Sequence, residues 1–181
     1  AHRLEGTPHP LMTKNGIDAI PFKHKRMDEW RENFKGLQYH HSATNFIITG
    51  AIDDLWINPK GEIIVVDYKA TSKDTAVNID AEWQGGYKRQ MEIYQWLVRN
   101  EGLPVSSTGY FVYCNGRRDL DGFNQRLEFD ISVLPYVGND SWVESAVIGA
   151  HICLQKSAPP PPSPTCDYCM YRLASESVLK R

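Results

Sequence analysis

The stretch GEIIVVDYKATS, Gly61 to Ser72, carries four consecutive apolar residues that lead directly into an acid, an aromatic residue and a lysine. Its unbroken apolar run, Ile63 to Val66, indicates a central strand that is covered by helices on both faces. Residues i and i+2 of a strand share a face, so Asp67 and Lys69 point the same way and Tyr68 points the opposite way. The sequence therefore predicts a carboxylate and an ammonium where a core strand emerges into a cleft.

The residues before this strand, LQYHHSATNFIITGAIDDLWIN (37–58), are rich in β-branched and aromatic side chains, which favour strands. Turn-forming residues follow in Asn58-Pro59-Lys60-Gly61. These residues predict a hairpin that pairs the region before them with the central strand.

The rest of the chain alternates between helical and strand patterns. Apolar residues at helical spacing predict helices over 80–100 and 140–156, and a short one over 27–34. Residues 107–114 and 125–131 read as further strands. The order predicts an α/β domain with a central mixed sheet and helices on its faces.

The expected domain organisation follows from a composition shift near the C-terminus. We expect one domain over residues 1–157, whose first 36 residues (1–36) are irregular or partly helical. The run SAPPPPSPT is an extended, semi-rigid spacer, so residues 158–165 are interpreted as a proline-rich linker. Residues 166–181 form a short tail that carries a CxxC motif.

Composition excludes several classes of protein. The 181 residues, 41% of them hydrophobic, suit one globular domain with a core. No apolar run approaches the ~20 residues that span a bilayer, and the first residues lack a signal-peptide pattern. We therefore expect no membrane association and a cytoplasmic location. The chain begins with Ala1 in place of Met, so we expect an N-terminally truncated fragment.

A net charge of −2 gives no global basic footprint for a polyanion. Any such partner would be bound by local patches, of which Lys23 to Arg26 and the pair Lys88 and Arg89 are candidates. Short charge runs of this kind are also common on solvated surfaces.

The predicted hairpin brings a second carboxylate close to Asp67, because Asp53 and Asp54 follow Gly50 on the preceding strand. Two neighbouring carboxylates repel unless a proton or a cation lies between them. Carboxylate oxygens suit Mg²⁺ or Mn²⁺, and a lysine beside a metal-bound water can orient it or stabilise charge on an attacked phosphate. A salt bridge between Asp67 and Lys69 on an edge strand is the alternative.

Three motifs occur in order over residues 50–94: Gly50-Ala51-Ile52-Asp53, Asp67-Tyr68-Lys69, and Gln90-Met91-Glu92-Ile93-Tyr94. This series resembles the PD-(D/E)xK nuclease superfamily, in particular its RecB-like branch, whose pattern is GxxD, DxK and QxxxY. The resemblance implies a restriction-endonuclease-like core. It further implies a Mg²⁺- or Mn²⁺-dependent deoxyribonuclease, an exonuclease on single-stranded or duplex DNA ends. Its setting would be DNA repair, recombination or defence, with a helicase or another DNA-processing protein as a possible partner.

The resemblance also implies a role for each motif residue. Asp53 and Asp67 would ligate the metal together with the backbone carbonyl of Tyr68, and Lys69 would position the attacking water. Gln90 and Tyr94, which are i and i+4 on one helical face, would hold Lys69 or a substrate phosphate.

Two residues near the motifs have no assigned role. Asp54 is expected to be an outer-shell or surface acid. His41 either lines the site or is a structural histidine with its own hydrogen-bond partners.

The sequence has four cysteines, and Cys166 and Cys169 have metal-ligand spacing. The stretch PTCDYCMYR resembles the C-terminal part of the iron–sulfur staple in AddB-type and CRISPR-associated nucleases of the same branch. No cysteine precedes the predicted sheet and none follows Cys169. Two thiolates are half of a usual site, so a [4Fe–4S] cluster or Zn²⁺ is expected only in the full-length protein.

Two other functions remain open from the sequence. The first is a catalytically inactive nucleic-acid-binding module of a larger complex. The second is an interaction domain in which the CxxC tail is a zinc-bound docking piece.

Overall fold

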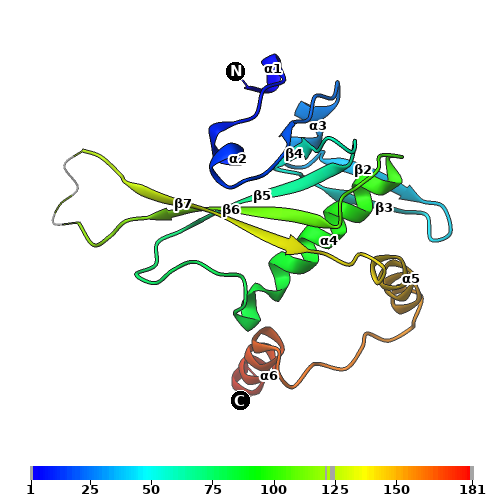
Figure 1. The fold of residues 1–181 in the computed structure, drawn as a ribbon. Coiled ribbons are helices and arrows are strands. Elements are labelled where there is room, and N and C mark those ends of the chain that lie inside the picture. Colours follow the sequence, from blue (N-terminus) through cyan, green and yellow to red (C-terminus); the bar gives the residue numbers. More distant parts are fainter. Residues whose placement is uncertain (1, 121, 123–124, 180–181) are drawn as a thin grey trace. The chain divides into compact units, whose positions relative to one another are not determined.

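The structure is a computed structural model that describes residues 2–120, 122 and 125–179. The chain divides into two compact units, Ala1–Val143 and Glu144–Arg181. The first unit contains both sheets, and the second contains nearly all of α5 (Val143–Leu154) and the whole of α6 (Asp167–Leu179) (Figure 1). Within the described residues, no helix combines the length and the apolar character needed to cross a membrane.

A five-stranded mixed sheet forms the centre of the first unit, as the sequence predicts. β5 is parallel to β6, and the other neighbouring strands are antiparallel. β5 is the third strand of the five, and residues 63–67 are all buried, which confirms that the apolar run is a central strand. The sheet order is β1 (Ile20–Pro21), β4 (Asp54–Ile57), β5 (Ile63–Thr71), β6 (Thr108–Gly116) and β7 (Phe129–Val137).

The predicted hairpin joins β4 to β5. Ile57 pairs with Ile63 beside the turn, and Asp54 pairs with Val66 at the far end of β4. The side chain of Asn58 closes the turn by accepting hydrogen bonds from the backbone N–H groups of residues 60 and 62. β5 continues beyond the end of β4, and this extension carries the acid and the lysine of the motif.

The strand-rich region 37–58 contributes to two separate sheets. β2 (Leu37–His41) and β3 (Phe46–Gly50) form a two-stranded antiparallel sheet of their own, and only β4 joins the central sheet. β-Propensity marks strands but carries no information about which partner each one takes. The sequence therefore predicted strands in this region but not their division between two sheets.

One long helix connects the two sheets. α4 (Gly85–Asn100) follows the short 3₁₀ helix η1 (Glu82–Gln84) and contacts β2, β3 and β5 (Figure 1). The predicted helix over 80–100 thus begins at Gly85. The two glycines of its sequence stand in the first turn, where their low helix propensity does least harm.

The N-terminal residues cover the opposite face of the central sheet. They form α1 (His2–Glu5), α2 (Pro10–Lys14) and β1, which pairs with β4. Met12 of α2 is buried in a core cluster with residues of three strands: Trp56, Ile64, Val66 and Val112. One face of β5 therefore meets this N-terminal cover, and the other face meets α4.

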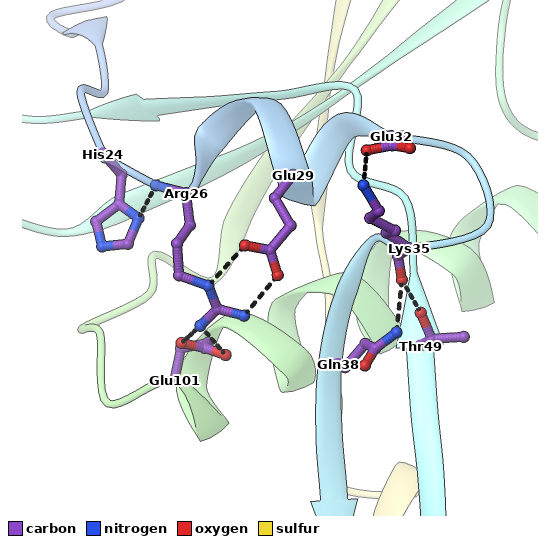
Figure 2. Close-up of polar contacts among 8 residues, drawn as sticks. All are labelled: His24, Arg26, Glu29, Glu32, Lys35, Gln38, Thr49 and Glu101. Carbon is purple, nitrogen blue, oxygen red and sulfur yellow. Dashed lines mark hydrogen bonds and ion pairs between the residues drawn. The ribbon is translucent and has the colours of Figure 1, made fainter.

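A polar cluster ties α3 (Met27–Arg31) to the end of α4 and to the small sheet (Figure 2). The guanidinium of Arg26 donates to Glu29 at 3.2 Å and to Glu101, just after α4, at 3.1 Å. The carbonyl of Lys35 accepts from Thr49 of β3 at 2.7 Å. α3 is shorter than the expected 27–34, and Phe34 follows it with a φ of 75°.

The C-terminal strand and helices also differ in extent from the sequence expectation. β7 begins at Phe129 and runs to Val137, later than the expected 125–131, because it pairs along the whole of β6. Pro135 is compatible with this strand because β7 lies at the sheet edge. The cysteine tail is helical, since α6 starts directly after Cys166.

The carboxylate of Glu92 fastens β7 and the loop after it to α4. It accepts hydrogen bonds from Tyr136 Oη at 2.6 Å, Trp142 Nε1 at 2.6 Å and the backbone N–H of Asn139 at 3.2 Å. The pKa of Tyr136 is raised to about 12, mainly by burial and in addition by the hydrogen bond and charge of Glu92.

Replacing this carboxylate should destabilise the protein. Glu92→Ala would leave the donors of Tyr136 and Trp142 without their acceptor, so we expect the free energy of unfolding to fall by about 3 kcal/mol. Urea denaturation of the two proteins measures this difference. Glu32→Ala is the control, because its exposed pair with Lys35 should contribute little. Equal stability of Glu92→Ala and wild type would contradict the assignment.

Candidate active site

The acid and the lysine of β5 lie on the face that α4 covers. Asp67 is 2% exposed, and Lys69 Nζ lies 2.5 Å from Asp67 Oδ2. Tyr68, between them, points to the opposite face, where its hydroxyl donates to Asp54 Oδ2 at 3.0 Å. The alternation of side chains along the strand therefore separates the pair from Tyr68, as the sequence predicts.

Asp53 lies beside this pair, just before β4 begins. Its Oδ2 accepts a hydrogen bond from the backbone N–H of Tyr68 at 2.7 Å. The N–H and C=O groups of one strand residue point to the same side, so the Tyr68 carbonyl also faces the side on which Asp53 lies. Two carboxylates and one carbonyl oxygen thus gather at the end of the hairpin.

The adjacent Asp54 has a different set of contacts. Its carboxylate accepts hydrogen bonds from Arg3 of α1, from the hydroxyl of Tyr68, and from the backbone N–H of Leu55 at 2.8 Å. These partners hold the N-terminal segment against the hairpin. Of the two neighbouring aspartates, it is Asp53 that acts on Asp67, because its charge helps to raise the pKa of that carboxyl.

Two side chains of α4 complete a chain of polar contacts. Lys69 Nζ donates to Gln90 Oε1 at 3.1 Å, and Gln90 Nε2 donates to Tyr94 Oη at 2.8 Å. Burial raises the pKa of Tyr94 above the ordinary tyrosine value. The structure thus joins Asp67, Lys69, Gln90 and Tyr94, all of them residues that the sequence singled out.

A further aromatic residue contacts the lysine. Lys69 Nζ lies 4.6 Å from the ring centroid of Tyr87, within the range of a cation–π interaction. Tyr87 belongs to none of the three sequence motifs. The available signal was its position three residues before Gln90, which places both on one side of the helix.

The electrostatics of Asp67 reflect its burial. Desolvation raises the pKa of its carboxyl, and Lys69, which favours the charged form, offsets only part of this rise. The ammonium of Lys69 is the ion-pair partner of Oδ2, and no other donor among the described residues reaches this buried oxygen. A buried carboxylate in this condition is stabilised by a cation.

The oxygen donors at this place fit a hard divalent cation. No three His, Cys, Asp or Glu side chains cluster as metal ligands in the part of the chain that the structure describes. Asp53 and Asp67 therefore supply two carboxylates, and a carbonyl oxygen and water or substrate oxygens would be the other ligands. Mg²⁺ is commonly held in this way, by one or two carboxylates, several waters and phosphate oxygens.

The two candidate basic residues of α4 lie in different surroundings. Lys88 Nζ is 3.7 Å from Asp80 Oδ1 and 5.8 Å from the ring centroid of Tyr136. Arg89 lines a groove of about 520 Å³ that Gln90 and Tyr94 also line. The remaining lining residues are Thr49, Gly50, Gly86, Ile93 and Trp142. Of the two cations, Arg89 is the one that shares a groove with site residues.

The sequence pattern of the PD-(D/E)XK nuclease superfamily matches residues 8–174. The chain belongs to this superfamily. No curated protein and no solved structure matches the chain significantly. The match confirms the predicted superfamily, and the mixed sheet between helices has the restriction-endonuclease-like arrangement. As a PD-(D/E)XK protein it is expected to be a hydrolytic nuclease that uses a divalent metal and acts on nucleic acid.

The glycine of the first motif has a steric role in this PD-(D/E)XK fold. A Cβ atom at Gly50 would lie 2.6 Å from Tyr94 Cε1 and 3.1 Å from Leu97 Cδ1. The backbone of β3 can therefore approach α4 closely only at a residue without a side chain. Gly50 thus leaves room for the Tyr94 ring, whose hydroxyl accepts the hydrogen bond from Gln90.

Adding one methyl group at this contact should disturb the site. We expect Gly50→Ala to lower the free energy of unfolding by about 1–3 kcal/mol through overpacking against Tyr94. Gly86→Ala is the matched control on α4, because a Cβ there meets no atom within 4 Å. Thermal and urea denaturation of both variants provide the measurement. A Gly50→Ala protein as stable as the Gly86→Ala protein would refute the steric role.

His41 is not part of the contact chain from Asp67 to Tyr94, and Cys166 and Cys169 belong to the second unit. His41 is buried in the small sheet, with Nδ1 2.7 Å from Thr44 Oγ1, so it has the partners of a structural histidine. Cys166 and Cys169 stand at the start of α6, where the backbone N–H of Cys169 and its thiol lower the pKa of Cys166. The same pairing raises the pKa of Cys169.

Proposed function

We propose that this protein is a metal-dependent deoxyribonuclease of the RecB-like branch that hydrolyses phosphodiesters at DNA ends. The observation that carries the proposal is the unbroken contact chain from Asp67 through Lys69 and Gln90 to Tyr94, beside a second carboxylate. A domain that serves binding alone needs no buried acid paired with an ammonium at the end of a central strand. DNA repair, recombination or defence is the proposed setting.

Each residue has a distinct task in this proposal. Asp53, Asp67 and the carbonyl of Tyr68 would hold Mg²⁺ or Mn²⁺, which supplies an activated water and neutralises charge on the phosphate when bound. Lys69 would orient the attacking water and donate a hydrogen bond to the phosphate as negative charge grows there. Gln90 would keep the ammonium in place, and Tyr94 would in turn orient the Gln90 amide.

Arg89 is the proposed phosphate-binding residue outside the reacting centre. Its guanidinium lines the groove beside Gln90, where a flanking phosphate of a DNA strand would pass. Lys88 makes its contact with Asp80 and would contribute to DNA binding only as a weaker, longer-range charge. We further propose a cytoplasmic location and a helicase or another DNA-processing protein as a partner.

The C-terminal thiols support a separate proposal within the same protein. Backbone N–H groups at the start of α6 form hydrogen bonds with the Cys166 sulfur and lower the pKa of this thiol. The lower pKa favours the thiolate, which is the form that binds metals. We propose that Cys166 and Cys169 bind Zn²⁺ or a [4Fe–4S] cluster together with ligands beyond these two.

The primary test compares wild type with Lys69→Ala on end-labelled single-stranded and duplex DNA in Mg²⁺ or Mn²⁺. We expect wild type to cleave and the variant to be slower by at least about 100-fold, because a group that stabilises the transition state is removed. EDTA should abolish cleavage by both proteins. A product ladder that grows from the labelled end would identify an exonuclease.

The control for this test is Lys60→Ala, which removes an exposed turn lysine and should retain full activity. DNA binding without cleavage by wild type would favour the alternative of an inactive binding module. Undiminished cleavage by Lys69→Ala would contradict the proposed role of Lys69 in the reaction.

A second test asks whether Asp67 holds the metal. In EDTA we expect Asp67→Asn to raise Tm by roughly 2–4 °C, the shift that about 1 kcal/mol gives in a chain of this size, because desolvation disfavours the ionised carboxyl more than Lys69 favours it. Added Mn²⁺ should raise the Tm of wild type and leave that of Asp67→Asn unchanged.

The matched control for the second test is Asp54→Asn. This change should lower Tm by weakening the contacts with Arg3 and Tyr68 while preserving the Mn²⁺-dependent rise. The assignment fails if Mn²⁺ stabilises Asp67→Asn as much as wild type.

A further inference from the structure

An exposed tryptophan lies one helical turn beyond the candidate site. Trp83 belongs to η1, directly before α4, and is 60% exposed. Its ring meets that of Tyr87 edge to face, with centroids 5.7 Å apart. Tyr87 is the residue whose ring contacts Lys69, so Trp83 is joined to the reacting centre through one aromatic side chain.

A second lysine accompanies this tryptophan. Lys73 Nζ lies 5.0 Å from the Trp83 ring centroid, four residues after Lys69 in the sequence. Its ammonium forms no ion pair with any acid in the described part of the chain. Lys69, Tyr87, Trp83 and Lys73 therefore form a continuous row in which two adjoining aromatic rings lie between two cations. We call these four residues the aromatic row.

The neighbouring arginines do not share this character. Arg118 pairs with Asp74, and Arg117 pairs with Asp119 at 2.8 Å. Although Lys73 and both arginines line a cavity of about 380 Å³, the arginine charges there are already neutralised by carboxylates. The unpaired lysine and the exposed ring thus distinguish the aromatic row from the rest of this surface.

We propose that Trp83 is a stacking platform for a nucleobase of single-stranded DNA, with Lys73 holding an adjacent phosphate. The inference rests on the proposed nuclease function and names its substrate form. Proteins that bind single strands combine cationic side chains for the backbone with aromatic rings on which bases stack. Both base faces inside a duplex are covered by neighbouring pairs, so the platform favours an unpaired strand.

The test measures affinity in EDTA, where cleavage is prevented, by fluorescence anisotropy of a labelled oligothymidine. We expect Trp83→Ala to raise Kd by about 5- to 150-fold and Trp83→Phe to raise it much less, because Phe keeps a stacking face. Phe34→Ala is the matched control, since Phe34 is a fully exposed aromatic residue after α3. Its Kd should equal that of wild type.

A second measurement separates stacking from a structural role of Trp83. The same oligonucleotide is prepared with its bases removed and its phosphates kept. Wild type should bind this abasic strand about as weakly as Trp83→Ala binds the normal one, and Trp83→Ala should bind both strands equally. Lys73→Ala should reduce the slope of log K against log salt by about 0.7, the value expected for one phosphate contact on a single strand.

The outcomes distinguish this inference from the nuclease proposal. Equal loss of affinity on base removal in wild type and Trp83→Ala would overturn the stacking platform and leave the nuclease intact. Duplex DNA bound more tightly than the single strand by wild type would also overturn it. If Trp83→Ala does not fold, Trp83→Phe and the abasic strand with wild type still decide the question. Absence of any DNA affinity in wild type at low salt would instead contradict the proposed function.

Discussion

The parallel pairing of β5 with β6 is the constraint on which the candidate site depends. Parallel neighbours cannot be joined by a tight turn, so the chain must cross over the sheet between them, and α4 makes that crossing. The crossing covers the face of β5 that carries Asp67 and Lys69 and brings Gln90 within 3.1 Å of the lysine. The opposite face is closed by the N-terminal segment through Met12, and it receives Tyr68 and Asp54. The two-sided cover of one strand therefore decides which polar side chains meet.

Burying charge at this position works against stability, and the surrounding contacts compensate only in part. Desolvation raises the pKa of Asp67 despite an ammonium 2.5 Å away, so its ionised form is disfavoured in the folded protein relative to water. Lys69 is compensated more completely, by the carboxylate, the Gln90 amide and the ring of Tyr87. A carboxylate whose charge the neighbouring lysine offsets only in part is the state expected of a site that binds a further cation. Stability is often lost at functional sites in this way.

Much of this arrangement follows from local sequence patterns. An unbroken apolar run identified β5 as central, the period of two placed Asp67 and Lys69 together, and the spacing i, i+4 placed Gln90 and Tyr94 on one helical face. The choice of Asp53 over Asp54 came from the motif resemblance and from no local period, and the contact that occupies Asp54 comes from Arg3, which is 51 residues away in the sequence. The separation of β2 and β3 from the main sheet, and the contact of Lys73 with Trp83, are likewise tertiary contacts without a local period. The sequence identified Gly50 as a motif glycine, but it did not show that a side chain at this position would clash with the ring of Tyr94.

One continuous segment carries both the proposed chemistry and the proposed binding. Trp83, Tyr87, Gln90 and Tyr94 recur at spacings of three and four residues, so they lie along one side of η1 and α4. At 1.5 Å per residue this side is about 16 Å long, more than the spacing of successive phosphates on a strand. A base stacked on Trp83 would therefore sit at a distance from Lys69 that is set by a helix packed on two sheets. Tyr87 links the two positions, because its ring contacts both Lys69 and Trp83. The position of a held nucleotide and the position of the reacting phosphate would then be coupled through rigid side chains, with no loop between them.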